Sequence, residues 1–324
     1  MTTKLIGCIL VLLKTLILIF CSEQKGNNTK RKLEIDYDSL SDDIIILHTN
    51  DVHGVVMDNI GYDGLMLYKK ELQKKYKYVI TVDVGDHIQA ETLTQAYNII
   101  QIMNHIQYDV ITIGEHEFDF GLEQIDEFDK SLYCGYTCSN FCLNNNPYFE
   151  PYKIIDTRDR KICFIGIIKP IDISKIISNE HADINTYSFG ADNTEEEFYN
   201  YVYTIIDRFS VENEKYIFII LSHLGIENDE QSKYTSDGLL SSLFDVKAVL
   251  EGHTHQAYND FKKDKNGNDI PIIQAGSNFS HIGVLTITTD EQILIDIISE
   301  IPEPEDKTGA MQVWRHGKNR WVDV

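Results

Sequence analysis

Five short segments rich in histidine and carboxylate residues constrain this chain more than any other feature of its sequence. Each segment directly follows an apolar run that is typical of a β-strand. Because open α/β sheets place their sites at the carboxyl ends of the strands, we expect the five segments to converge on one rim. The runs are residues 44–47, 79–84, 110–113, 216–221 and 246–250, and the segments that follow them are residues 51–54, 85–86, 114–119, 222–225 and 252–255.

The residue types in these segments are those that bind borderline divalent metals. Zinc, manganese and iron ions accept imidazole nitrogen and carboxylate oxygen, and two ions about 3.5 to 4 Å apart need a carboxylate that bridges them. Asp86 is the candidate bridge. A single Asp-x-His after a strand is weak evidence, because half-buried histidines paired with the backbone are common. Five such elements in order favour a two-metal centre that hydrolyses phosphate esters.

Five strings in and near these segments resemble the amino-terminal domain of secreted 5'-nucleotidases and apyrases, within the calcineurin-like metallophosphoesterases. The strings are ILHTNDVHG at residues 46–54, HEFD at 116–119, SHLG at 222–225, HTH at 253–255 and QAGS at 274–277. The resemblance covers roughly residues 42–300. It implies an α/β fold with four layers, αββα, in which two sheets pack as a sandwich. It also implies metal-dependent hydrolysis of phosphoric esters of the 5'-nucleotidase type.

The resemblance also implies a role for each candidate site residue. The first divalent ion would be held by Asp51, His53, Asp86 and His255, and the second by Asp86, Glu115, His223 and His253. His116, paired with Asp119, would stabilise the transition state or protonate the leaving oxygen. The two ions would be zinc, manganese or similar metals, and the substrate would be a small nucleotide.

Position 115 departs from the family, which has asparagine where this chain has Glu115. Two divalent ions contribute +4, Asp51 and Asp86 reduce this to +2, and an ionised Glu115 would reduce it to +1. A less positive centre polarises phosphate less and acidifies water less. Either the chemistry is impaired, or Glu115 binds metal through one oxygen and activity survives with a changed metal preference.

The sequence predicts four regions and one missing domain. Residues 1–22 are expected to be a signal peptide, 23–41 a polar flexible segment, 42–300 the metallophosphoesterase domain and 301–324 a short tail. The family's carboxyl-terminal domain, which supplies aromatic and arginine contacts to the substrate, is expected to be absent. The tail contains Trp314 and Trp321 and is expected to be mobile or docked on the body, with base stacking as the less favoured alternative.

The signal peptide predicts a secreted protein without a stable membrane span. Lys4 precedes an apolar run over residues 5–20, and Lys14 interrupts the run, which disfavours a permanent transmembrane helix. Asn27 begins an expected glycosylation site. Asn278 begins a second acceptor sequence, which we expect to be unmodified because it lies near the predicted metal site.

Charge excludes one class of substrate. The chain has 29 basic and 51 acidic residues, and removing residues 1–22, which hold two lysines and no acid, leaves 27 against 51, a balance of −24. Such a surface repels nucleic-acid backbones, so we expect no nucleic-acid polymer as substrate. A small nucleotide can still reach a locally positive metal centre.

Four cysteines outside the signal region predict one or two disulfide bonds in an exported chain. They are Cys134, Cys138, Cys142 and Cys163, and three full pairings are possible. A zinc knuckle is the alternative, but the spacing of four between the first three differs from the tight Cys-x2-Cys of structural zinc sites.

Apolar periodicity predicts helices between the strands. Leu65, Tyr68, Leu72 and Tyr76 form one apolar face, and Ile99, Ile102, Met103 and Ile106 form another. A third helix is predicted over residues 194–209, and strands are predicted at 162–168, 269–273, 282–288 and 293–298.

Two functions of different class are compatible with these features. The first is a secreted two-metal phosphohydrolase acting on small nucleotides. The second is a catalytically weak, secreted family member that binds a nucleotide or a partner protein. Intact catalytic positions favour the enzyme, whereas Glu115 and the missing substrate domain favour the binder.

Overall fold

The computed structural model describes residues 37–158, 160–176, 184–191, 194–209, 215–226, 233–301, 312–315 and 320–323. The predicted signal peptide, the acceptor Asn27 and the predicted contacts of the tail side chains lie outside the described residues. Among the described residues, no helix is both long enough and apolar enough to cross a membrane.

The first sheet has five strands. They are β1 (Ser41–Thr49), β2 (Tyr76–Asp83), β3 (Val110–Ile111), β13 (Ile282–Ile287) and β14 (Ile293–Ile298). Their order is β14-β13-β1-β2-β3. Strands β1, β2 and β3 are parallel, whereas β13 pairs antiparallel with both β1 and β14. The three parallel strands therefore end at the same rim of the sheet.

The second sheet has six strands. They are β6 (Tyr152–Thr157), β7 (Arg160–Ile168), β9 (Tyr216–His223), β10 (Val246–Glu251), β11 (Ala257–Lys263) and β12 (Asp269–Ala275). Their order is β11-β12-β10-β9-β7-β6, in which the four inner strands are parallel and both edge strands antiparallel. Strands β9 and β10, which precede two of the predicted metal-binding segments, are neighbours at its centre.

The core between the sheets explains why central strands such as β1 and β9 contain continuous apolar runs. In β1, Ile44 and Ile46 join a cluster shared with the second sheet, and Ile45 and Leu47 face the helices on the other side. Strand β9 alternates in the same way, with Ile219 in the shared cluster. Both faces of β1 and β9 are thus buried, so these strands contain runs of consecutive apolar residues rather than an apolar residue at every second position.

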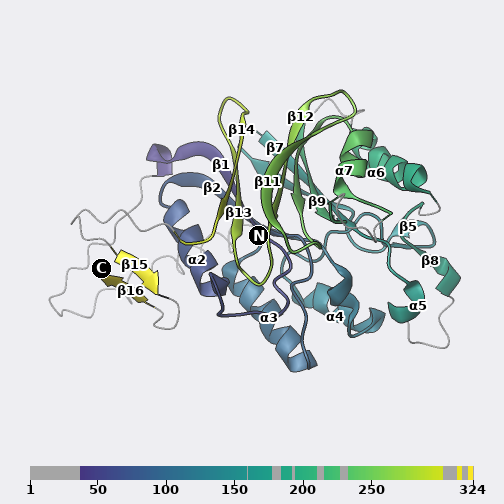
Figure 1. Cartoon of the computed structure of the whole chain (residues 1–324), viewed down its shortest axis with the longest axis horizontal. Helices are drawn as coiled ribbons and strands as arrows, with labels where there is room; N and C mark the ends of the chain where they lie inside the picture. Colours follow the sequence, from purple (N-terminus) through teal and green to yellow (C-terminus); the bar gives the residue numbers. More distant parts are fainter. Residues whose placement is uncertain are drawn as a thin grey trace, which may run out of the picture. The chain divides into compact units, whose positions relative to one another are not determined.

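Helices cover both outer faces. Helices α2 (Gly61–Leu72), α3 (Leu93–Ile106) and α4 (Leu122–Ser131) pack on the first sheet, and α6 (Glu195–Phe209) and α7 (Ser236–Ser242) pack on the second. Figure 1 shows the strands between these two groups of helices, blue and green respectively. The predicted four-layer αββα sandwich is therefore correct.

Several short elements complete the described chain. They are the 3-10 helices η1 (Tyr37–Ser39), η2 (Glu115–Phe118) and η3 (Ile184–Thr186), the short helix α5 (Ile173–Ile176), a small sheet of β5 (Asn146–Pro147), β4 (Cys142–Leu143) and β8 (Tyr187–Ser188), and a hairpin of β15 (Gln312–Arg315) and β16 (Arg320–Asp323). The hairpin lies within the predicted tail, and its two strands were not predicted.

Side-chain caps mark the starts of two helices, and one helical prediction is wrong. The Thr92 side chain and Gln95 form a capping box at the start of α3, and the Thr194 hydroxyl accepts a hydrogen bond from Glu197 N, 3.1 Å away, before α6. Tyr76 was wrongly placed on the first helical face. Helix α2 ends at Leu72, and Tyr76 begins β2, where it pairs with Ser41.

The disulfide prediction is wrong for the described cysteines, because none of the four is disulfide-bonded. Burial in different layers separates Cys163 from Cys138. Cys163 lies in the core between the second sheet and its helices, whereas Cys138 lies in the core of the first sheet. Burial also raises the pKa of both thiols to about 12. The alternative zinc knuckle has no support either, since no metal-binding group among the described side chains contains a cysteine.

Candidate metal centre

The predicted segments meet where the parallel strands of both sheets end. Asp51 N donates to Gly85 O at 3.0 Å, and His53 N donates to Asp86 O at 2.8 Å, so the loops after β1 and β2 are bonded together. The loop after β10 joins them, since His253 N lies 2.9 Å from Asp51 Oδ2. The predicted convergence on one rim is therefore observed.

Backbone conformation marks these loops as unusual. Five of the seven predicted ligands have left-handed backbones, with positive φ values of 51° at Asp51, 49° at His53, 55° at Asp86, 85° at His253 and 56° at His255. Left-handed backbone at a non-glycine residue costs about 1 to 3 kcal/mol and persists only where the surrounding structure holds it. Such clustering is typical of functional sites.

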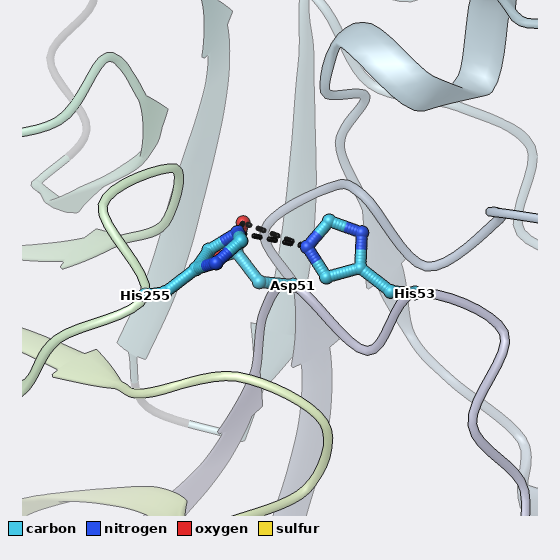
Figure 2. A group of neighbouring side chains, drawn as sticks. All are labelled: Asp51, His53 and His255. Carbon is cyan, nitrogen blue, oxygen red and sulfur yellow. Dashed lines mark hydrogen bonds and ion pairs between the residues drawn. The ribbon is translucent and has the colours of Figure 1, made fainter.

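Asp51, His53 and His255 form one group (Figure 2). The Nε2 atoms of His53 and His255 lie 2.8 Å apart, and they lie 3.9 and 3.4 Å from Asp51 Oδ1. Burial would raise the pKa of Asp51, but His255 and His223 lower it below its usual value. An ionised carboxylate and two imidazole nitrogens thus point at one place, where they could hold a divalent cation.

Glu115, His223 and His253 form a second group. Glu115 lies 3.1 Å from His223 Nε2 and 3.0 Å from His253 Nδ1. Burial would raise the pKa of Glu115, but both histidines lower it well below its usual value. This residue therefore carries its negative charge at neutral pH.

Asp86 lies between the two groups. Its Oδ1 accepts a hydrogen bond from His116 N at 2.9 Å, and its Oδ2 lies 3.3 Å from His223 Nε2. Its carboxylate forms one potential metal-binding set with Asp51 and His223, and another with His53 and His116. This central position suits a carboxylate that serves two ions.

The chemistry of His223 tests whether the residues fit a metal. His223 Nδ1 donates to Val84 O at 2.6 Å, so the fully buried Nε2 points at carboxylate oxygens without a hydrogen-bond partner of its own. A lone pair in that place repels the carboxylates unless a cation or a proton lies between them. Burial lowers the pKa of His223, but Asp86 and Glu115 raise it well above its usual value. The two carboxylates thus favour a positive charge next to Nε2. The donor set therefore fits a divalent ion.

Gly114 keeps space open at this place. A Cβ atom there would lie 2.2 Å from Asp86 Oδ1 and 2.7 Å from His223 Nε2. Any side chain at position 114 would therefore fill the gap between the two groups of ligands.

A buried hydrogen-bond network around Glu117, next to the Asp86 backbone, was not predicted. Glu117 accepts hydrogen bonds from the backbone nitrogens of Asp86 at 2.8 Å, Ile88 at 2.9 Å and Gly114 at 2.7 Å. His87 lies 3.4 Å from the same carboxylate. Glu117 thus joins the loop that carries Asp86 to the loop that carries Glu115 and His116. Glu117 stands in the HEFD string, but only the fold brings its three backbone donors together.

Replacing Glu117 with glutamine should loosen both loops. An amide group would face backbone N–H donors, so we expect Glu117→Gln to destabilise the protein by about 2 kcal/mol and to weaken metal binding about 10- to 100-fold. Urea denaturation and metal titration would measure the two effects. The matched control is Glu127→Gln, which changes an exposed glutamate paired with Lys130 and should change neither quantity. Equal behaviour of the two variants would refute a positioning role for Glu117.

His116 and Asp119 lie at the edge of the cluster. His116 Nδ1 lies 3.0 Å from Asp119 Oδ2, and the His116 ring is 5.2 Å from that of His53, centre to centre. Burial would lower the pKa of His116, but Asp86 and Asp119 raise it above its usual value. A partly exposed imidazole with a raised pKa beside the ligands can donate a proton or stabilise negative charge.

Two further residues support or adjoin the site. Asn50 donates to Asp51 Oδ2 at 2.6 Å and to Gly276 O at 2.7 Å, which connects the first loop to the QAGS string. Lys169 Nζ lies 2.9 Å from His253 Nε2. It was not predicted, because the predicted metal-binding segments are defined by histidines and carboxylates. Its position directly after the apolar run of β7 is the signal that could have found it.

Asn278 lies beside the site as expected, since its backbone nitrogen donates to Asp51 O at 2.8 Å. The absence of glycosylation there stays a prediction.

Comparison with known proteins shows similarity to 5'-nucleotidases. A snake venom 5'-nucleotidase from Crotalus adamanteus is 25% identical over 288 residues, which cover 77% of this chain and 46% of the relative. The chain spans about half the length of the first curated relatives it matches, with values of 46% and 51%.

Solved structures show the same fold. A 5'-nucleotidase precursor from Thermus thermophilus superposes with a TM-score of 0.63 at 19% identity, over 79% of this chain and 54% of that one. A calcineurin-like phosphoesterase from Bacillus subtilis gives 0.60 at 21% identity, over 79% of this chain and 90% of that one. The sequence model of the calcineurin-like phosphoesterase family matches residues 44–257, which is more than half of the chain. The chain therefore belongs to the calcineurin-like phosphoesterase family.

Proposed function

We propose that this protein is a secreted two-metal phosphohydrolase that acts on small nucleotides. The observation that carries the proposal is the pair of ligand groups on either side of the Asp86 carboxylate. Family membership supports divalent-metal dependence, and the similarity to 5'-nucleotidases supports a nucleotide substrate. Secretion is supported by the apolar run at residues 5–20 and by the venom origin of one relative.

The residues divide the work of hydrolysis. Asp51, His53, Asp86 and His255 would hold one ion, and Asp86, Glu115, His223 and His253 would hold the other. When bound, two divalent ions polarise the phosphate and activate water for attack on it. Val84 O and Glu117 keep His223 and Asp86 in orientation. Lys169 adds positive charge beside His253, where it suits an incoming phosphate group.

His116 would complete the reaction at the leaving oxygen. Asp119 orients the imidazole through Nδ1 and favours its protonated form. The protonated ring then gives a proton to the oxygen as its bond to phosphorus breaks.

A panel of substrates tests the proposal. Purified protein is incubated with AMP, ADP, ATP and an aryl phosphate in the presence of Mn, Zn, Mg or Ca, and phosphate release is measured. We expect release with at least one nucleotide and its loss on chelation. Binding of a nucleotide without phosphate release under every condition would instead favour the second candidate, a catalytically weak binding protein.

Glu115 is the specific feature that favours this second candidate. Its ionised carboxylate reduces the positive charge of the centre, so Glu115→Asn should raise phosphatase activity near neutral pH and shift the rising limb of the pH-rate profile to lower pH. The comparison is made at saturating metal, with metal content checked in both proteins. An unmoved profile, or activity lost together with a metal ion, would show that Glu115 is an adapted ligand in a competent enzyme.

A further inference from the structure

A cavity of about 490 Å³ opens beside the candidate metal centre. Its walls include His116, Asp119 and Glu115 from the segment that follows β3, and Ile171, Asp172 and Ile176 at and before α5. This volume lies within the range of about 300 to 1,000 Å³ that is typical of small-molecule sites. Ile171, Asp172 and Ile176 neither belong to the metal centre nor stand in a sequence string that suggested the function.

We propose that this cavity binds the leaving group of the phosphate ester and that the group it fits is an uncharged nucleoside. This proposal rests on the proposed function. It identifies the cavity that holds the group attached to the leaving oxygen.

The position of His116 supports a leaving-group site. In the hydrolysis, water adds to phosphorus, the bond from phosphorus to the nucleoside oxygen breaks, and that oxygen takes a proton from His116, which the attacking water then restores. The leaving oxygen must therefore lie next to the His116 ring, on the side of phosphorus opposite to the attacking water. A substituent on that oxygen extends away from the ligand cluster. The cavity that His116 and Asp119 line is the space on that side.

The chemistry of the walls selects the class of leaving group. Ile171 and Ile176 offer aliphatic surface against which a flat base can pack. Asp119 and Asp172 offer carboxylate oxygens that accept hydrogen bonds from ribose hydroxyls or an exocyclic amine. The carboxylate of Asp172 is held by Ser174, whose backbone nitrogen and hydroxyl donate to Oδ1 at 3.0 and 2.7 Å.

The same carboxylates disfavour an anionic leaving group. Hydrolysis of a nucleoside diphosphate at its terminal phosphate would leave a second phosphate group in the cavity that Asp119 and Asp172 line, and like charges repel. The cavity therefore favours a nucleoside monophosphate over a diphosphate.

Ile171→Ala tests the proposal with two readouts. For AMP, we expect kcat/KM to fall about tenfold, because part of the apolar wall is lost. For methyl phosphate, whose leaving group does not reach this wall, we expect a change of less than twofold. The matched control is Ile155→Ala, which changes a half-buried isoleucine on β6 and should affect neither substrate. Wild-type protein should also hydrolyse AMP with a higher kcat/KM than ADP.

The second readout does not require catalysis. Adenosine binding is measured by calorimetry with wild-type protein, Ile171→Ala and Ile155→Ala, and only Ile171→Ala should weaken it. No adenosine binding, equal binding by all three proteins, or an equal loss of AMP and methyl phosphate hydrolysis would overturn the proposal. An ADP preference would also overturn it. If no phosphate ester is hydrolysed, the proposed function fails. The adenosine measurement then tests by itself whether the cavity binds a nucleoside.

Discussion

Replacing Asp86 with alanine is expected to remove both metal ions from the protein and to abolish phosphatase activity. Asp86 is the carboxylate between the two ligand groups, and a bridging ligand contributes to both ions. Its side chain is almost fully buried. Metal content per protein, measured by plasma mass spectrometry after dialysis, is the direct readout.

Two further variants make this result interpretable. Asp86→Asn keeps the shape of the side chain and an acceptor for His116 N, so it separates the loss of charge from misfolding. Asp260→Ala, at an exposed aspartate of β11, should retain both metals and full activity. Two metals in both Asp86→Ala and Asp86→Asn would mean that the bridge is assigned to the wrong residue.

Replacing His116 with alanine should lower turnover by about a hundredfold or more while leaving metal content nearly unchanged. This is the range expected for a positioned general acid or a group that stabilises charge in the transition state. The pair with Asp119 and the raised pKa of His116 suit that role. Turnover and metal content are measured on the same preparation.

The exposed His105 of α3 provides a matched control, since His105→Ala should change neither turnover nor metal content. Loss of metal from His116→Ala would instead make His116 a ligand. The structure keeps this outcome open to test, because His116 lies close enough to His53 and Asp86 to share an ion with them.

The positions of the candidate ligands could be predicted because they depend on strands. Each predicted ligand segment follows an apolar run long enough to be read as a strand, and parallel strands bring their carboxyl ends to one rim. The pairing of β1 with β2 over His48 and Val82 shows how tightly this aligns the segments that follow. Residue type and strand order together were enough to bring Asp51, Asp86 and His223 into one cluster.

Features that depend on packing between distant segments could not be predicted. Tyr76 continues the helical period of α2, but its place is decided by pairing with Ser41 in β2. Glu117 and Lys169 gain their roles from backbone groups and a histidine that lie far away in the sequence. The separation of Cys138 and Cys163 into different cores likewise follows from the layers, which composition does not reveal.

The most direct test of the account is the anomalous diffraction of crystals grown with manganese. The account predicts two manganese peaks about 3.5 to 4 Å apart, with the Asp86 carboxylate between them. One peak would have Asp51, His53 and His255 as neighbours, and the other Glu115, His223 and His253. A single peak, or two peaks that do not share Asp86, would contradict the two-metal centre proposed for this protein.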